Sequence, residues 1–187
     1  MLHIITVATH SERYLPVLDK ILEDKGIKLN KLGFGKKYEG HFMKDLETLE
    51  FVKEKPEDDV VVFLDGFDSI PLGDPEEILR KFRSMNKKMV VSTENVRNSF
   101  LLHSYNFQKV LGKYINTGLI IGYCGFMKNF LQEMYSIDYD KKSNQKTWAR
   151  FLNNECNGKI NMDDIGVDRN SELFLNHSFT CNNNFKL

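Results

Sequence analysis

A run of five apolar residues, Val60 to Leu64, leads directly into Asp65-Gly66-Phe67-Asp68. The run has the length and the β-branched content of a strand that is covered on both faces, as in a parallel sheet. Because Gly66 should end the strand, Asp65 and Asp68 are expected to leave its carboxyl end side by side in a turn. Ligands of open α/β sheets bind at that end of the strands.

Two carboxylates in such a turn suit a hard divalent cation. Proteins usually hold Mg²⁺ or Mn²⁺ with one or two carboxylates and let substrate phosphates supply further oxygens. The sharper interpretation of Asp65 and Asp68 is therefore a metal–diphosphate site of a nucleotide-sugar transferase. The simpler interpretation is an acidic turn in contact with solvent, and these two residues alone do not decide between the two.

The composition indicates one folded domain without a strong overall charge. The 187 residues are 41% hydrophobic, and the 26 Lys and Arg residues balance 26 Asp and Glu residues. This balance gives no general attraction for nucleic acid or for an anionic membrane. No stretch resembles a signal peptide or a membrane-spanning helix. We therefore expect a single cytoplasmic domain over residues 1–187, with no nucleic-acid partner and no membrane span; the oligomeric state stays open.

Strand and helix patterns alternate along the chain. Apolar runs predict strands over residues 3–8, 29–34, 60–64, 88–92 and 114–122, the last interrupted by Asn-Thr-Gly. Helical spacing predicts a first helix that is capped by Thr9 or Ser11 and stopped by Gly26. It predicts further helices over residues 42–54, 75–83, 124–135 and 146–153. The alternation predicts an α/β fold with a mostly parallel central sheet flanked by helices.

A series of short motifs follows one order along residues 3–178. The motifs are Thr6-Val7-Ala8-Thr9, Leu32-Gly33-Phe34-Gly35 with Tyr38, Gly40 and Lys44, Phe63-x-Asp65-x-x-Asp68, Ser92-Thr93-Glu94, Tyr114-Ile115-Asn116-Thr117-Gly118, and Val167-Asp168 with Leu173-Phe174-x-Asn176. In this order and spacing they resemble the glycosyltransferase domain of procollagen lysyl hydroxylases. The related collagen galactosyltransferases share parts of the pattern.

The resemblance implies a GT-A fold, a UDP-sugar donor and a bound Mn²⁺ or Mg²⁺. By the same resemblance, Asp65 and Asp68 are the metal ligands. Phe67 takes the place of a Tyr that packs against uracil, and Lys44 falls near the donor phosphates. The residues implied to bind the donor nucleotide are Thr9, Tyr38, Lys44, Phe67 and Asn116.

The chain departs from the family's pattern on the side that would face the acceptor. Where the family has Asp-Asp-Gln before a helix, this chain has Ser143-Asn144-Gln145, and the two neutral side chains cannot take up a proton. The catalytic candidates on this side are Asn144, Asp140 and Glu94, with Asp138 as a further carboxylate. The family's third metal ligand lies in a His-Gly-Asn segment, which this sequence does not reach, so we expect the C-terminal segment to be missing.

Three functions remain open from the sequence. The first is a metal-dependent glycosyltransferase that moves a hexose from a UDP-sugar to a hydroxyl of a protein or glycan, such as the hydroxylysine sites of a collagen-like protein. The second is a catalytically weak nucleotide-binding scaffold, or a partner of an active paralogue. The third is a nucleotidyltransferase or hydrolase. Asp65, Asp68 and Lys44 favour the first, whereas Ser143-Asn144 favours the second. The many Asn and Lys residues suggest an AT-rich genome such as that of a large virus.

Overall fold

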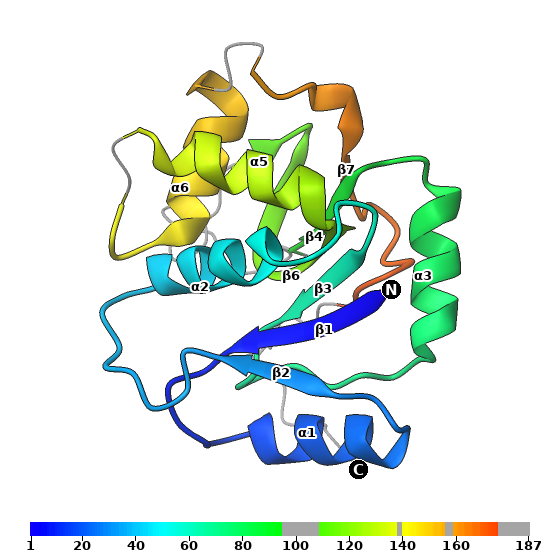
Figure 1. Cartoon of the computed structure of the whole chain (residues 1–187). Helices are drawn as coiled ribbons and strands as arrows, with labels where there is room; N and C mark the ends of the chain where they lie inside the picture. Colours follow the sequence, from blue (N-terminus) through cyan, green and yellow to red (C-terminus); the bar gives the residue numbers. More distant parts are fainter. Residues whose placement is uncertain (95–108, 138–139, 156–158, 176–187) are drawn as a thin grey trace, which may run out of the picture.

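The computed structural model describes residues 1–94, 109–137, 140–155 and 159–175, which form a sheet with helices on both faces (Figure 1). The strands are β1 (Leu2–Val7), β2 (Leu29–Leu32), β3 (Val60–Leu64), β4 (Met89–Thr93), β5 (Lys109–Val110), β6 (Lys113–Tyr123) and β7 (Ile165–Val167). The helices are α1 (Leu15–Asp24), α2 (Phe42–Lys53), α3 (Pro75–Ser84), α5 (Cys124–Tyr135) and α6 (Asn144–Arg150). A π-helical turn, Phe151–Glu155, continues α6, and a 3₁₀ turn, Met162–Asp164, precedes β7.

The sheet has the order β2-β1-β3-β6-β4-β7, and β5 pairs with β6 outside that path. Strands β2, β1 and β3 pair in parallel, as do β4 and β7. Among the described strands, β6 alone runs in the opposite direction, and it lies between β3 and β4. The expectation of a mostly parallel α/β sheet is therefore confirmed. The parallel strands end on one edge, and β6 begins near that edge.

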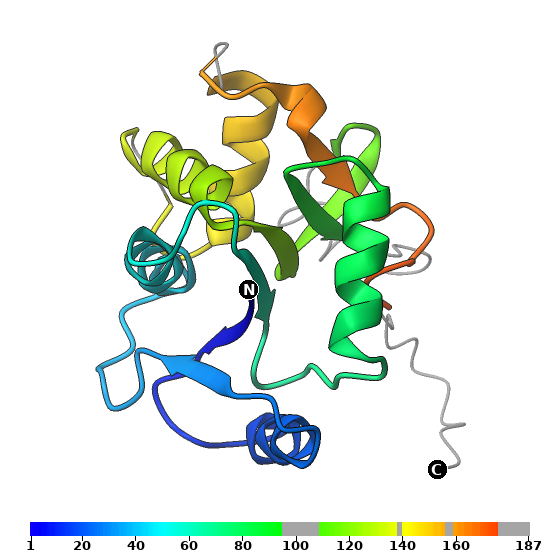
Figure 2. The ribbon, with the colours of Figure 1, turned by 45° about the vertical axis from the view of Figure 1, so that its right-hand side comes forward.

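Alternating side chains of the strands fill a core on each face of the sheet. On one face, Ile5 and Phe63 lie in a cluster with buried residues of α2, α5 and α6. On the other face, Ile4 and Val62 lie in a cluster with Leu18 of α1 and Phe82 of α3. Figure 2 shows these two groups of helices on opposite sides of the sheet. Because β3 is buried along its whole length, its continuous apolar sequence is explained.

Most expected elements are found, and the differences have local causes. The first helix begins at Leu15 after an uncapped Tyr14, so neither Thr9 nor Ser11 caps it. The last helix begins at Asn144, earlier than expected, because the Ser143 hydroxyl accepts a hydrogen bond from the Lys146 amide. Strand β6 is continuous along β3, and only its pairing with β4 is broken near Asn-Thr-Gly. The short strands β5 and β7 were missed.

A polar cluster is buried between α2, α5 and α6. Asp45 is only 4% exposed, and its carboxylate accepts hydrogen bonds from the Tyr135 hydroxyl at 2.5 Å and from the Asn144 amide at 3.4 Å. The indole N–H of Trp148 is close enough to lower the pKa of the same carboxyl, but it makes no hydrogen bond of normal geometry. Burial raises the pKa of Asp45 from 3.8 to about 6, although these donors and Lys44 act to lower it.

Replacing Asp45 by Asn should stabilise the protein at neutral pH. Since the pKa of Asp45 is raised in the folded state, its ionisation costs stability as the pH rises from about 4 to about 6, and the cost stays constant above that. Asn resembles the protonated carboxyl and avoids this cost. The free energy of unfolding of Asp45→Asn should exceed that of the wild type by on the order of 2–3 kcal/mol at pH 7.5, and by much less at pH 4.

Urea unfolding at the two pH values measures this difference. Asp24→Asn is the matched control, because its carboxylate is 60% exposed and paired with Lys20 on the surface of α1. This control should behave like the wild type at both pH values. A wild-type protein that is more stable than Asp45→Asn at pH 7.5 would contradict the assignment of a costly buried charge.

Candidate functional site

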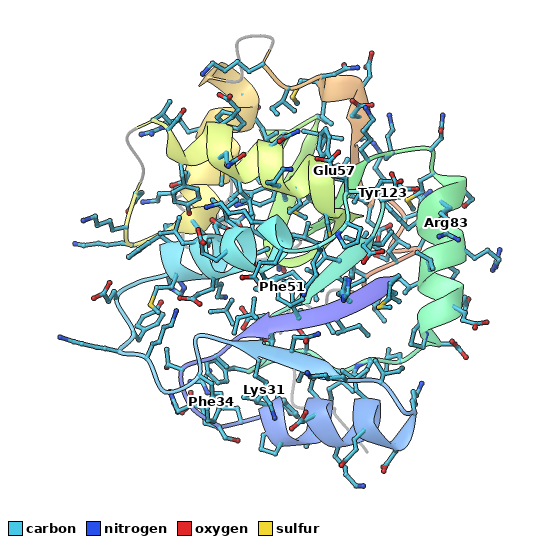
Figure 3. The ribbon with its side chains drawn as sticks, in the orientation of Figure 1. Lys31, Phe34, Phe51, Glu57, Arg83 and Tyr123 are labelled. Carbon is cyan, nitrogen blue, oxygen red and sulfur yellow. The ribbon has the colours of Figure 1, made fainter. Side chains whose placement is uncertain are left out.

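The turn after β3 is held closely against β1. The Asp65 amide donates to the Gly118 carbonyl at 2.8 Å, which extends the pairing of β3 with β6 by one residue. A Cβ atom at Gly66 would lie 2.6 Å from the Thr6 hydroxyl oxygen, a distance that real Cβ atoms do not reach. Only glycine therefore allows the turn to pack in this way, and the turn fixes where Asp65 and Asp68 leave the sheet. Figure 3 labels Phe34 at this carboxyl-end edge, and Glu57 and Tyr123 near the opposite edge.

Asp65 forms an ion pair with Lys44, which lies in the first turn of α2. The two side chains are 20% and 18% exposed, so water screens their attraction only in part. The pair joins residues that are 21 positions apart in the sequence. The structure thus brings together Lys44, expected near the donor phosphates, and Asp65, expected as a metal ligand.

Asp68 lies in the electrostatic field of several other charged groups. Partial burial and the nearby Asp65 carboxylate raise the pKa of Asp68 above its ordinary value, and Glu94 adds to this effect. Lys44 and Arg13 act in the opposite direction. Much of the Asp68 side chain is exposed to solvent. Its pKa is nevertheless raised, so the surroundings disfavour the negative charge of the ionised carboxylate. A cation bound at this turn would remove that penalty.

Asn116 connects Glu94 to the turn that carries Asp65. Its amide nitrogen donates to the Glu94 carboxylate at 2.9 Å, and its amide oxygen accepts from the Gly118 amide at 2.8 Å. A Cβ atom at Gly118 would lie 3.0 Å from the Asn116 oxygen and 3.5 Å from Cβ of Asp65. Glycine thus lets Asn116 and Asp65 approach each other, and the structure places Glu94 behind Asn116 at the same edge.

Thr9 and Phe67 are joined by a residue that the sequence did not single out. The ring of His10 lies 5.6 Å from the ring of Phe67, centroid to centroid, and its Nδ1 is 3.0 Å from the Thr9 hydroxyl. The Thr9 carbonyl also accepts from the Gly35 amide at 2.9 Å. The ends of β1 and β3 therefore share one small polar and aromatic surface. The position of His10 directly after Thr9 was the available signal.

Tyr38 lies in the loop before α2 and close to the Lys44–Asp65 pair. Its ring is 52% exposed and meets the His41 ring edge-on, with centroids 5.9 Å apart. Burial raises the pKa of Tyr38. The Lys44 charge lowers this pKa and the Asp65 charge raises it, so both charged groups lie near the hydroxyl. Burial and then Lys44 lower the pKa of His41. His41 is thus a second histidine near the site that sequence reasoning missed.

The side chains of two of the three catalytic candidates make other contacts. Asn144 is 5% exposed and donates to Asp45 in the buried cluster, so its side chain faces the protein interior. The Asp140 carboxylate accepts from the Lys142 amide at 2.8 Å and shapes its own loop. Asp138 lies outside the described residues. The Asn144 side chain thus takes part in interior packing, whereas Glu94 bonds to Asn116, one of the residues predicted to bind the donor. The catalytic roles themselves stay predictions.

The described residues contain no group of three or more His, Cys, Asp or Glu side chains arranged to hold a metal ion. Gln145, which the sequence analysis gave no role of its own, bonds to the backbone of β6 on both sides of Asn116.

Three curated relatives cover part of the chain. Human procollagen-lysine,2-oxoglutarate 5-dioxygenase 2 is 32% identical over 114 residues, which are 60% of this chain and 15% of that protein. Its mouse counterpart is 29% identical over 154 residues, 73% of this chain and 20% of that protein. The uncharacterised protein R699 of Acanthamoeba polyphaga mimivirus is 28% identical over 134 residues, 64% of this chain and 29% of that protein. The chain thus spans less than a third of each relative's length.

A solved structure supports the fold. The chain is similar to a glycosyltransferase involved in the glycosylation of the major capsid of PBCV-1, with a TM-score of 0.52 over 89% of this chain and 81% of that chain, at 12% identity. The architecture is of the GT-A type. Among the residues that the structure describes, every helix is too short or too polar to cross a bilayer. The family described as PLOD GT domain matches residues 1–185. The chain belongs to this family of glycosyltransferase domains.

Proposed function

We propose that residues 1–187 form one GT-A domain that transfers a hexose from a UDP-sugar to a hydroxyl group, with Mn²⁺ or Mg²⁺ as cofactor. The observation that carries the proposal is the meeting of Asp65, Asp68 and Lys44 at the carboxyl end of β3. A glycosyltransferase domain needs a sugar donor and an acceptor. The names of the relatives, which refer to procollagen lysine, suggest hydroxylysine of a collagen-like protein as an acceptor.

The side chains at the turn fit a hard divalent cation. Asp65 and Asp68 offer carboxylate oxygens, which Mg²⁺ and Mn²⁺ prefer. Burial raises the pKa of Asp68, and the nearby Asp65 and Glu94 carboxylates add to that rise; a cation at this turn would favour the ionised carboxylate. A bound cation would neutralise part of the negative charge on the diphosphate of the leaving UDP. Lys44, already placed at Asp65, would neutralise part of the charge that remains.

The aromatic residues around the same edge suit the nucleoside. Phe67 offers an apolar ring face for uracil, and the Thr9 hydroxyl next to His10 offers a polar partner for the base or the ribose. Tyr38, half exposed on the loop before α2, lies on the side of Lys44. A pocket built from a few aromatic faces and a few placed polar groups is typical of small-ligand sites.

Glu94 is our candidate for the residue that activates the acceptor hydroxyl. It is a partly exposed carboxylate near Asp68, and Asn116 fixes its direction with a hydrogen bond of 2.9 Å. A carboxylate can accept the proton that the acceptor loses, whereas an amide such as Asn144 cannot. Asn144 bonds with Asp45 in the interior, so a carboxylate restored there would place two acids together in a buried space.

A second function, the nucleotide-binding scaffold, is favoured by one observation. In the segment Ser143-Asn144-Gln145, the first residue caps α6, the second bonds to the buried Asp45, and the third bonds to the backbone of β6. None of these three side chains replaces the missing acids. If Glu94 does not act as a base, the domain would bind a donor nucleotide without turning it over at a useful rate.

Asp68→Asn should remove most of the metal-dependent part of UDP binding. The variant keeps the size of the side chain but takes away one of two charged metal ligands. We expect the gain in UDP affinity on adding Mn²⁺ to fall by about tenfold or more, as measured by calorimetry with Mn²⁺ and with EDTA. Asp19→Asn is the matched control, since this carboxylate pairs with Lys31 on the surface. An unchanged metal dependence in Asp68→Asn would show that the cation binds elsewhere.

Glu94→Gln should separate transfer from binding. The amide keeps a hydrogen bond to Asn116 after rotation but cannot accept a proton. If the wild type releases UDP from a UDP-sugar in the presence of an acceptor, kcat of Glu94→Gln should fall by about 100-fold or more, and UDP affinity should stay within about twofold. Wild-type UDP binding without any transfer across a screen of donors and hydroxyl acceptors would instead favour the scaffold. Equal kcat values for both proteins would refute a role for Glu94.

A further inference from the structure

Gln145 makes three hydrogen bonds to the neighbouring strand β6. Its side-chain oxygen accepts from the Thr117 amide and from the Thr117 hydroxyl, both at 2.9 Å. Its side-chain nitrogen donates to the Ile115 carbonyl. An amide side chain has two donors and two acceptor positions, so Gln145 uses most of its hydrogen-bonding capacity on one short segment. Its place in the first turn of α6 gives this side chain a rigid base.

The segment that Gln145 holds is the irregular part of β6. Opposite β4, the register jumps from the pair Val91–Ile120 to the pair Ser92–Asn116. Thr117, Gly118 and Leu119 are therefore left without partners in β4, and the Thr117 amide needs another acceptor. Gln145 supplies that acceptor. The side chain thus replaces the ladder bonding that the bulge has lost.

The same bulge carries the contacts that orient Asp65. The Gly118 carbonyl accepts from the Asp65 amide at 2.8 Å, and the Gly118 amide donates to Asn116 at 2.8 Å. Asn116 in turn donates to Glu94. Gln145 forms its hydrogen bonds with the two residues on either side of Asn116, Ile115 and Thr117. Hydrogen bonds at both ends and the backbone of residues 115–118 between them therefore connect α6 to the turn after β3.

We propose that Gln145 is a positioning residue of the candidate site, whose amide fixes the Ile115–Leu119 bulge and so holds Asn116 and Asp65 in place for a metal–nucleotide ligand. This proposal rests on the proposed function for the identity of the ligand. Its geometric part is independent of any ligand. Gln145 itself faces the strand, so it orders the residues of the site without touching the substrate.

Amide hydrogen exchange, measured by NMR without ligand, tests the geometric part. In Gln145→Ala, the amides of Thr117 and Asp65 should exchange at least about tenfold faster than in the wild type, while those of β1 stay unchanged. In parallel, UDP affinity in the presence of Mn²⁺ should fall about tenfold or more, the usual effect of losing an outer support of a metal site. Ser143→Ala is the matched control, because it weakens the cap of α6 and leaves the three bonds of Gln145 intact.

Gln145→Glu provides a second variant with an internal control. Its carboxyl can still accept from Thr117, but when ionised it turns an oxygen toward the Ile115 carbonyl, whereas the protonated form can donate there as the amide does. Because an ordinary glutamic acid has a pKa of about 4.3, protection of Thr117 and Asp65, after correction for intrinsic exchange rates, should be closer to the wild-type value at pH 4 than at pH 8. This rescue keeps the proposal testable if Gln145→Ala fails to fold.

The outcomes separate this proposal from the proposed function. Unchanged exchange at Asp65 in Gln145→Ala, or an equal loss of UDP affinity in Ser143→Ala, would overturn the positioning role. If the wild type binds neither Mn²⁺ nor UDP, the proposed function fails and the ligand part of this proposal fails with it. Faster exchange at Asp65 would then still establish that Gln145 holds the turn.

Discussion

The antiparallel strand β6, inserted between β3 and β4, is the constraint on which the candidate site depends. On one side it pairs regularly with β3 up to Leu64, and the Gly118 carbonyl then receives the Asp65 amide. On the other side it bulges away from β4 after Asn116. One strand therefore orients the acidic turn with its backbone and offers Asn116 with its side chain. Bulges that re-aim a side chain beside a functional site are a recurrent device of sheets.

Charge at this edge is balanced only in part. Lys44 pairs with Asp65, yet burial and the nearby Asp65 carboxylate, with a smaller effect of Glu94, still raise the pKa of Asp68. Asp45, the next residue of α2, is buried with Asn144 and Tyr135, so this helix carries a partly exposed lysine and a buried acid at adjacent positions. The first of these arrangements suits a charged ligand, whereas the second belongs to the packing of α6. This contrast is why the acceptor side is assigned to Glu94 rather than to Asn144.

The sequence predicted the parts of the site that depend on local pattern. The buried run before Asp65 identified β3, its carboxyl end and the acids that follow it, because a continuous apolar strand has few alternatives. The burial of Asn144 and the hydrogen bonds of Gln145 could not be predicted, because both depend on how α6 packs against distant elements. Asn144 bonds to Asp45 of α2, 99 positions away, and Gln145 bonds to residues of β6 that are 28 and 30 positions away. His41 was overlooked because an isolated histidine forms no spacing pattern, and His10 was overlooked although it directly follows Thr9. Strand β7 was missed because its three residues are too few to show a strand pattern.

Paramagnetic broadening of backbone NMR signals by Mn²⁺ in the presence of UDP tests the central claim most directly. The ion broadens signals of nearby nuclei, so it reports where the metal–nucleotide complex binds on the folded protein. The account predicts that the amides of residues 65–68 and 116–118 lose intensity first, and that those at the end of α1, around Asp24, keep theirs. Uniform broadening, or broadening centred on another surface, would contradict a metal–nucleotide site at the carboxyl end of β3.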